Sequence, residues 1–130
     1  MAFKLYSTSD GRVPAVEYLP VSSITPKAGM ALYLNGGNLA IATGTTAPTY
    51  LCVREEDAAR KAGDLIPVIR IESDMIFETT NSAELSASVG SKVTLHATNG
   101  LQVTGTTTDG VAEIVYKSGS AAGSTVRVRF

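Results

Sequence analysis

The chain has 130 residues, of which 44% are hydrophobic and 18% are charged, and its formal net charge is −1. This length and composition fit one globular domain with a core of its own and argue against global disorder. Without a basic excess to neutralise phosphates, we expect no nucleic-acid partner. The single cysteine, Cys52, excludes an internal disulfide and a zinc site built from several cysteines.

The amino end, MAFKLYSTSDGRVP, contains no apolar run of signal-peptide length. No later segment is long and apolar enough to span a bilayer. We therefore expect a protein that is made in the cytoplasm and has no membrane partner.

Apolar residues alternate in the amino-terminal stretch 2–8, which precedes an Asp10-Gly11 turn signal. One interpretation is an ordinary first strand, and the other is an arm that orders only when it docks onto a partner. In the second case Phe3, Leu5 and Tyr6 are the candidate contact residues. The sequence accordingly divides into an amino-terminal segment, 1–20, and a single β-rich domain, 21–130.

Turn signals and residues with a two-residue period fill the rest of the chain. Asn35-Gly36, Asn99-Gly100 and Asp109-Gly110 are turn dipeptides, because Asn, Asp and Gly tolerate positive φ. Between these turns the alternation of apolar and polar residues is typical of half-buried antiparallel strands. The predicted strands cover residues 13–19, 30–34, 38–43, 50–54, 65–72, 74–80, 92–97, 111–117 and 125–130.

Two of these strands predict which side chains face inward. In 92–97, Val93, Leu95 and Ala97 share one face, which leaves His96 on the other. In 125–130, the inward residues are Val126, Val128 and Phe130, and both arginines point outward. The sequence thus predicts an all-β fold, mostly antiparallel, built as a small β-barrel or β-sandwich-like domain.

Evidence for helices is limited to two short segments. Residues 55–63 have acids first, bases later and a glycine at the end, which suits a turn or two of helix or, equally, a charged surface loop. Residues 81–89 have room for a single helical turn. We therefore expect at most one or two short helical turns.

The glycine-rich stretch LYLNGGNLAIATGTTAPTYL, residues 32–51, raises the question of a phosphate-binding loop. A Walker loop needs a lysine after its last glycine, and a dinucleotide loop needs a long helix to follow; neither is present. A β-hairpin with its bend at Gly36 and Gly37 explains the stretch better. Leu39 and Ile41 then share a face with Leu32 and Leu34, and residues 43–49 form an exposed loop.

A motif of Lys, Ala and Gly occurs twice, at 27–29 and 61–63, each time just before a predicted strand. Because so few positions match, we interpret it as one kind of tight turn used twice rather than a duplicated module.

The residues that could carry chemistry are few. A nucleophilic mechanism would need His96 or Cys52, but a strand-face histidine and a small buried cysteine are the simpler interpretations. The acidic run 55–57 lacks the alternating spacing of a calcium loop. Glu72 and Asp74 are the nearest approach to a glycosidase carboxylate pair, and we expect them to be surface residues. We therefore predict no enzyme activity, no catalytic or metal site and no cofactor.

The order of the strand and turn segments resembles that of small head-decoration, or capsid cement, proteins of tailed bacteriophages. The segments that carry the resemblance are 26–39, 50–53, 61–68, 89–95 and 123–130. The resemblance implies a small β-rich domain on the outer surface of an expanded capsid. It also implies a virion protein whose partner is the major capsid protein. Such a protein binds the capsid as a trimer and adds mechanical stability without catalysis.

Two alternatives remain open at this point. The chain could be another virion subunit, from a tail tube, a connector or the base of a head fibre. It could also be a small enzyme or a carbohydrate-binding module, although the absence of tryptophan disfavours sugar stacking.

Overall fold

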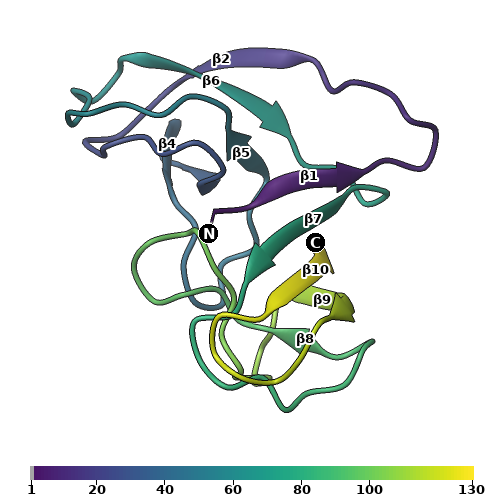
Figure 1. Cartoon of the computed structure of the whole chain (residues 1–130). Coiled ribbons are helices and arrows are strands. Elements are labelled where there is room, and N and C mark those ends of the chain that lie inside the picture. The colour runs from purple at the N-terminus through teal and green to yellow at the C-terminus, as the bar shows by residue number, and fades with distance from the viewer. Residues whose placement is uncertain (1) are drawn as a thin grey trace.

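The computed structural model describes residues 2–130, and this part of the chain consists of ten strands without a helix (Figure 1). The strands form two antiparallel five-stranded sheets, so the all-β prediction is confirmed. Sheet A has the order β1-β7-β10-β9-β8, and sheet B has the order β2-β6-β5-β3-β4. The strands are β1 (Lys4–Ser7), β2 (Val16–Pro20), β3 (Ala31–Asn35), β4 (Asn38–Ile41), β5 (Tyr50–Cys52), β6 (Leu65–Arg70), β7 (Ile76–Thr80), β8 (Lys92–Val93), β9 (Ala112–Lys117) and β10 (Thr125–Arg129).

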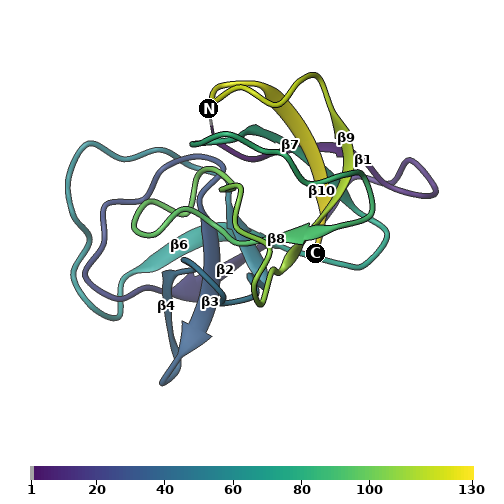
Figure 2. The ribbon, with the colours of Figure 1, turned by 90° about the horizontal axis from the view of Figure 1, so that it is seen from below.

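The chain passes between the sheets at two connections in the described residues. It leaves sheet A between β1 and β2 and returns to it between β6 and β7. The two connections run side by side, because each joins the same two pairs of strands. In sheet A, β1 pairs with β7, and in sheet B, β2 pairs with β6. Figures 1 and 2 show the resulting arrangement, with β2 and β6 in one layer and β1, β7 and β10 in the other.

The amino-terminal segment is a strand in this structure. Lys4 lies opposite Glu78 of β7, and the backbone N–H of Phe3 donates to the carbonyl of Gly29 (3.1 Å). Of the two alternatives for residues 2–8, the structure therefore has the first strand rather than a free arm. Residues 2–20 contribute one strand to each sheet.

The main core lies between the sheets and follows the predicted alternation. Val126 and Val128 of β10 are fully buried, whereas Arg127 and Arg129 point outward. Half-buried Phe130 contacts the rings of Phe3 (centroids 5.5 Å apart) and Phe77 (5.7 Å). Other large members of this core are Leu51, Ile69, Met75, Leu85, Val93, Leu95 and Ile114.

Sheet B encloses a second, smaller core because it curls. Its edge strands β2 and β4 approach one another at a parallel bridge between Val21 and Leu39, where the Ser22 N–H donates to the Leu39 carbonyl (2.9 Å). The contact does not extend into a ladder, so the sheet is not closed into a barrel. The buried side chains inside the curl are Val21, Met30, Leu32, Leu39, Tyr50, Cys52, Ile66 and Val68.

The glycine-rich stretch forms the predicted hairpin. Leu32 lies opposite Ile41 and Leu34 opposite Leu39, which places all four side chains on one face. The bend consists of Gly36 and Gly37, both with positive φ (62° and 89°). This is the conformation that a two-residue hairpin turn requires, and glycine adopts it without steric cost.

The two Lys-Ala-Gly motifs adopt the same turn. The Lys27 carbonyl accepts from the Met30 N–H (3.0 Å), and the Lys61 carbonyl accepts from the Asp64 N–H (3.1 Å). Gly29 has a φ of 81° and Gly63 a φ of 92°. Glycine in the third position of such a turn is expected on conformational grounds, so the repeat reflects shared turn chemistry.

Of the two structures predicted for residues 55–63, the chain has the surface loop. Three other local predictions need correction. Residues 81–89, which have room for a helical turn in the sequence, contain no helix. The predicted strand 92–97 ends as β8 at Val93, because the Leu95 N–H donates to the Gly44 carbonyl (2.9 Å) instead of continuing the ladder. The loop 43–49 is therefore not simply exposed, since Gly44 bridges to Leu95 and Pro48 is buried.

The loop 96–102 leaves sheet A and docks onto sheet B. The Gly100 carbonyl accepts from the Ala31 N–H of β3 (2.8 Å), and Leu101 packs against the core inside the curl. A Cβ atom on Gly100 would lie 2.7 Å from Ile41 Cγ2 and 3.1 Å from the Ala31 carbonyl oxygen. The loop can approach the sheet this closely because Gly100 has no side chain.

Comparing Gly100→Ala with Gly36→Ala separates this close approach from backbone strain, since both glycines have a φ of 62°. A Cβ on Gly36 meets no atom within 4 Å, so its replacement costs about 1 kcal/mol from the positive φ alone. Gly100→Ala adds overpacking and is expected to cost roughly 1–3 kcal/mol more. Urea unfolding measures the difference; equal losses would show that the docked loop does not hold the sheets.

Candidate interaction surfaces

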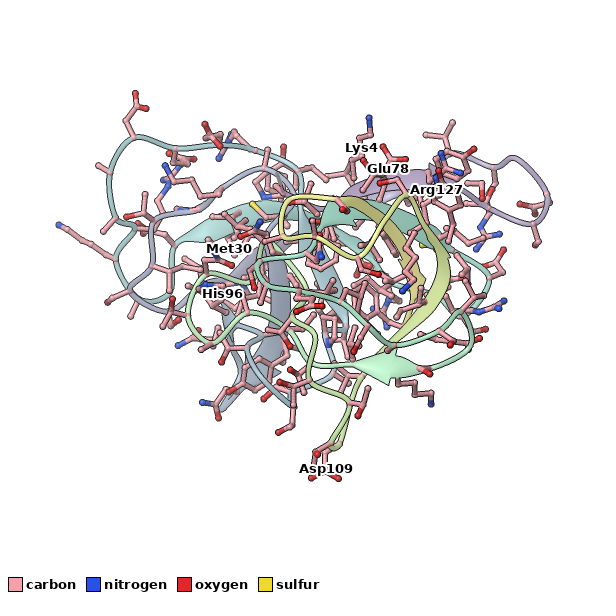
Figure 3. All side chains as sticks on the ribbon, turned by 60° about the horizontal axis from the view of Figure 1, so that its bottom comes forward. Lys4, Met30, Glu78, His96, Asp109 and Arg127 are labelled. Carbon is pink, nitrogen blue, oxygen red and sulfur yellow. The ribbon has the colours of Figure 1, made fainter. Side chains whose placement is uncertain are left out.

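The outer face of sheet A carries a stack of two tyrosines on an arginine. The Arg127 guanidinium lies 3.9 Å from the ring centroid of Tyr6 and 4.5 Å from that of Tyr116. Its Nε donates to Glu78 (2.9 Å), which also pairs with Lys4 (3.5 Å). Figure 3 shows Lys4, Glu78 and Arg127 together at one side of the molecule. We call Lys4, Tyr6, Glu78, Tyr116 and Arg127 the Arg127 cluster.

The ion pairs of the Arg127 cluster shift the affinity of its groups for protons. The hydrogen bond from Arg127, followed by the charge of Lys4, lowers the pKa of Glu78 in spite of partial desolvation. The same bond raises the pKa of Arg127. Glu78 and Arg127 thus remain an ion pair at neutral pH, and Arg127 on β10 contacts side chains of β1, β7 and β9.

The three residues predicted as capsid contacts have different environments. Phe3 is buried, with 2% of its surface exposed, and Leu5 is half-buried against the main core. Tyr6 is exposed, but its ring is stacked on Arg127. Phe3 therefore cannot contact a partner in this fold. The alternation of apolar residues in this segment reflects the packing of strand β1 against the core.

A patch of exposed apolar side chains lies on the outer face of sheet B, beyond the part that sheet A covers. Val16 and Tyr18 of β2 are 52% and 59% exposed, and Leu65 of β6 is 55% exposed. Val53, which follows β5, lies on the same face. Its N–H donates to the carbonyl of buried Pro67 on β6 (3.2 Å), and Pro67 in turn lies opposite Tyr18 of β2. We call Val16, Tyr18, Val53 and Leu65 the Tyr18 patch.

The sequence alone does not predict the Tyr18 patch, although the alternation of apolar residues in β2 indicates part of it. Val16 and Tyr18 alternate within the predicted strand 13–19, so their shared face was predictable. Whether sheet A covers that face depends on how the two sheets pack, which no local pattern specifies.

Glu72 and Asp74 do come together, but an arginine occupies the position between them. Arg12 donates through Nη1 to Asp74 (2.6 Å) and to Asp10 (3.0 Å), and through Nη2 to Glu72 (2.9 Å). The Ser9 hydroxyl adds a bond to Asp74 (2.7 Å). Hydrogen bonds from Arg12 first, and from Ser9 next, hold the pKa of Asp74 well below its usual value. We call Arg12, Asp10, Glu72 and Asp74 the Arg12 clasp.

His96 stabilises a turn. Its Nδ1 lies 3.2 Å from the Thr98 N–H and 3.3 Å from the Asn99 N–H, so it accepts from the backbone of the docked loop. This assigns the proton of the neutral ring to Nε2. The residue is half-buried and outside a regular strand, which corrects the predicted strand-face position.

The remaining candidates also have structural partners. Cys52 is buried, in agreement with the prediction, its thiol donates to the Arg54 carbonyl (3.1 Å), and burial raises its pKa. In the acidic run, Glu56 pairs with Arg54 (3.0 Å) and with Arg60. Residues 2–130 contain no group of three His, Cys, Asp or Glu side chains arranged to hold a metal ion.

One open groove of about 420 Å³ lies at the end of sheet B. Arg70 borders it, stacks on the ring of Tyr50 (5.4 Å) and pairs with Glu17 (3.2 Å). Leu34 and Tyr33 also line it. Since Arg70 is already engaged on both sides, the groove offers an apolar, aromatic surface rather than a free charge.

Comparisons with protein-family models, with curated proteins and with solved structures found no match. In residues 2–130 there is no helix with the length and apolarity needed to cross a membrane.

The low pKa of Asp74 predicts a pH-dependent contribution to stability. Because the pKa of Asp74 is lower in the folded chain than in the unfolded chain, its charge stabilises the fold. This stabilisation is complete above the usual carboxyl pKa of 3.8 and is lost as the pH falls toward the pKa of the folded state. Asp74→Asn is thus expected to lower Tm at pH 7 and to differ much less from the wild type at pH 2.

Thermal unfolding at both pH values measures this change, and Asp57→Asn in an exposed loop is the control. A Tm difference between wild type and Asp74→Asn that is the same at both pH values would contradict the role assigned to the clasp.

Proposed function

We propose that this chain is a structural virion protein that binds the outer surface of a tailed-phage capsid and stabilises the shell. The resemblance to head-decoration proteins in residues 26–39, 50–53, 61–68, 89–95 and 123–130 motivates the proposal. The observation that carries it is the Tyr18 patch, in which three of four apolar side chains are more than half exposed and gather on one face of sheet B. Apolar side chains gathered in this way on a small domain indicate a surface that a partner covers.

A shell is a partner for which a small patch suffices. Each contact with the patch contributes modest free energy, but a lattice presents the same contact at many equivalent positions. Copies that also touch one another around a three-fold position hold neighbouring shell subunits together. In this proposal the partner is the major capsid protein, the bound form is a trimer, and the location is the capsid surface.

The role we propose is mechanical rather than catalytic. Each ionisable group considered as a catalyst has a partner that serves the fold: His96 accepts from a turn, and Glu72 and Asp74 bind Arg12. These contacts favour a chain whose contribution is a rigid surface.

Cosedimentation tests the proposal. The purified chain is mixed with expanded capsids of the phage that encodes it, and we expect it to pellet with them and to raise the temperature at which they rupture. Tyr18→Ser is expected to weaken binding by at least about tenfold, because it removes the largest exposed apolar group of the patch. Val89→Ser, at a site 60% exposed outside the patch, is the matched control and should bind normally.

Failure of the wild type to bind expanded capsids would overturn the proposal. Rings or tubes formed by the isolated chain would favour a tail-tube or connector subunit instead.

A further inference from the structure

The backbone of β2 has a row of hydrogen-bonding groups that point away from sheet B. Pro67 has no N–H, and its carbonyl accepts from Val53 on the β5 side. Tyr18 lies opposite Pro67 on the β2 side. In an antiparallel ladder both polar groups of a residue point to the same side, so Pro67 and Tyr18 form a pair without hydrogen bonds. The N–H and C=O of Tyr18 therefore point outward.

The bonds that follow β2 agree with this alternation. The Val21 N–H donates to Asp64 on the β6 side (2.9 Å), whereas the Ser22 N–H donates to Leu39 on the opposite side (2.9 Å). Residues in step with Ser22, namely Val16, Tyr18 and Pro20, thus direct their backbone groups to the open edge, and Glu17 and Leu19 direct theirs to β6.

No strand of the described chain covers this edge at Val16 and Tyr18. The nearest one, β4, begins at Asn38 after the glycine bend and touches β2 where Val21 meets Leu39. That bridge is parallel, so β4 continues past Val21 and away from Val16. Pairing stops at the hairpin tip, and the backbone edge ahead of it stays open beside the exposed side chains of Val16 and Tyr18.

We propose that the edge of β2 at Val16 and Tyr18 is a strand-addition site for an extended segment of another polypeptide. The segment pairs with the outward N–H and C=O groups of both residues. Its apolar side chains, at alternate positions, lie beside Val16 and Tyr18 on the face that carries the Tyr18 patch. A row of alternating donors and acceptors with a two-residue period fits an extended polypeptide backbone.

A second copy of this chain fits the edge poorly. Two-fold pairing of β2 with itself is antiparallel, and three registers bring outward-pointing residues together. Val16 opposite Val16 places Tyr18 against Pro14, and Tyr18 opposite Tyr18 places Val16 against Pro20; each loses a bond because proline has no N–H. The third register places Glu17 directly opposite Glu17, and like charges there are destabilising.

The area of the patch leads to the same conclusion. Four side chains that are about half exposed offer roughly 400 Å², about half of the ~800 Å² per partner typical of a stable interface. Main-chain bonds to an added strand supply what the patch alone lacks. The occupant is therefore a foreign extended segment with apolar residues at alternate positions.

The test uses the full chain and a short synthetic peptide with valine at alternate positions, threonine between them and lysine at each end. Backbone amide exchange is followed by NMR. In the free chain, Val16 and Tyr18 amides exchange fast and Glu17 and Leu19 amides slowly. Saturating peptide is expected to slow exchange at Val16 and Tyr18 by at least about tenfold.

Two substitutions at one position separate main-chain pairing from side-chain contact. Val16→Thr keeps the outward N–H and the shape of the side chain, and it should bind as the wild type does. Val16→Pro keeps an apolar side chain but removes the outward N–H without touching the ladder to β6. We expect it to bind about tenfold more weakly.

Several outcomes would overturn the assignment. Among them are equal affinities of Val16→Pro and Val16→Thr, and a peptide at millimolar concentration that leaves the Val16 and Tyr18 amides unchanged. A wild-type dimer in sedimentation that Val16→Pro converts to monomers would make a second copy the occupant. Slow exchange at Glu17 and Leu19 verifies that each variant is folded. The peptide experiment on the wild-type chain tests the proposal even if a variant does not fold.

Discussion

One arginine joins the two connections that run between the sheets. Arg12 lies in the connection from β1 to β2, and its acidic partners Glu72 and Asp74 lie in the connection from β6 to β7. These are the two places where the described chain passes between sheets, and Arg12 joins them. With the connections held side by side, β1 lies beside β7 in one sheet and β2 beside β6 in the other. The ladder that presents Tyr18 therefore begins at the clasp.

A second tie connects the sheets at a distance from the clasp, and it depends on backbone rather than charge. Gly100 binds the Ala31 N–H, and the buried hydroxyl of Thr79 donates to the Leu101 carbonyl (2.6 Å). His96 keeps the loop in shape by accepting from the turn that precedes Gly100. Because this tie has no ion pair, it is insensitive to salt, whereas the partly exposed clasp is screened. The two ties thus respond differently to solution conditions.

Features set by neighbouring residues were predictable from the sequence, and those set by distant ones were not. The Gly36-Gly37 bend and the inward valines of β10 follow from turn chemistry and a two-residue period. The clasp joins residues about sixty positions apart, and no local pattern pairs Arg12 with Asp74. The alternation of Phe3 and Leu5 with polar residues fits a docking arm and a strand equally well. Only the burial of Phe3 in the structure distinguishes the two. Strand 92–97 was cut short at Val93 by Gly44, a tertiary contact that overrides local propensity.

The two edges of sheet A differ from the open edge of β2. The edge strand β1 is short, has a bulge between Leu5 and Ser7, and carries the charged Lys4. The opposite edge, β8, has two residues. Short, bulged or charged edges resist pairing with other chains. At β2 that protection is partial: Pro14 and Pro20 flank the open groups, and Glu17 lies between them. These residues block self-pairing but leave Val16 and Tyr18 free to bind, so the edge excludes its own copies while admitting a strand of different sequence.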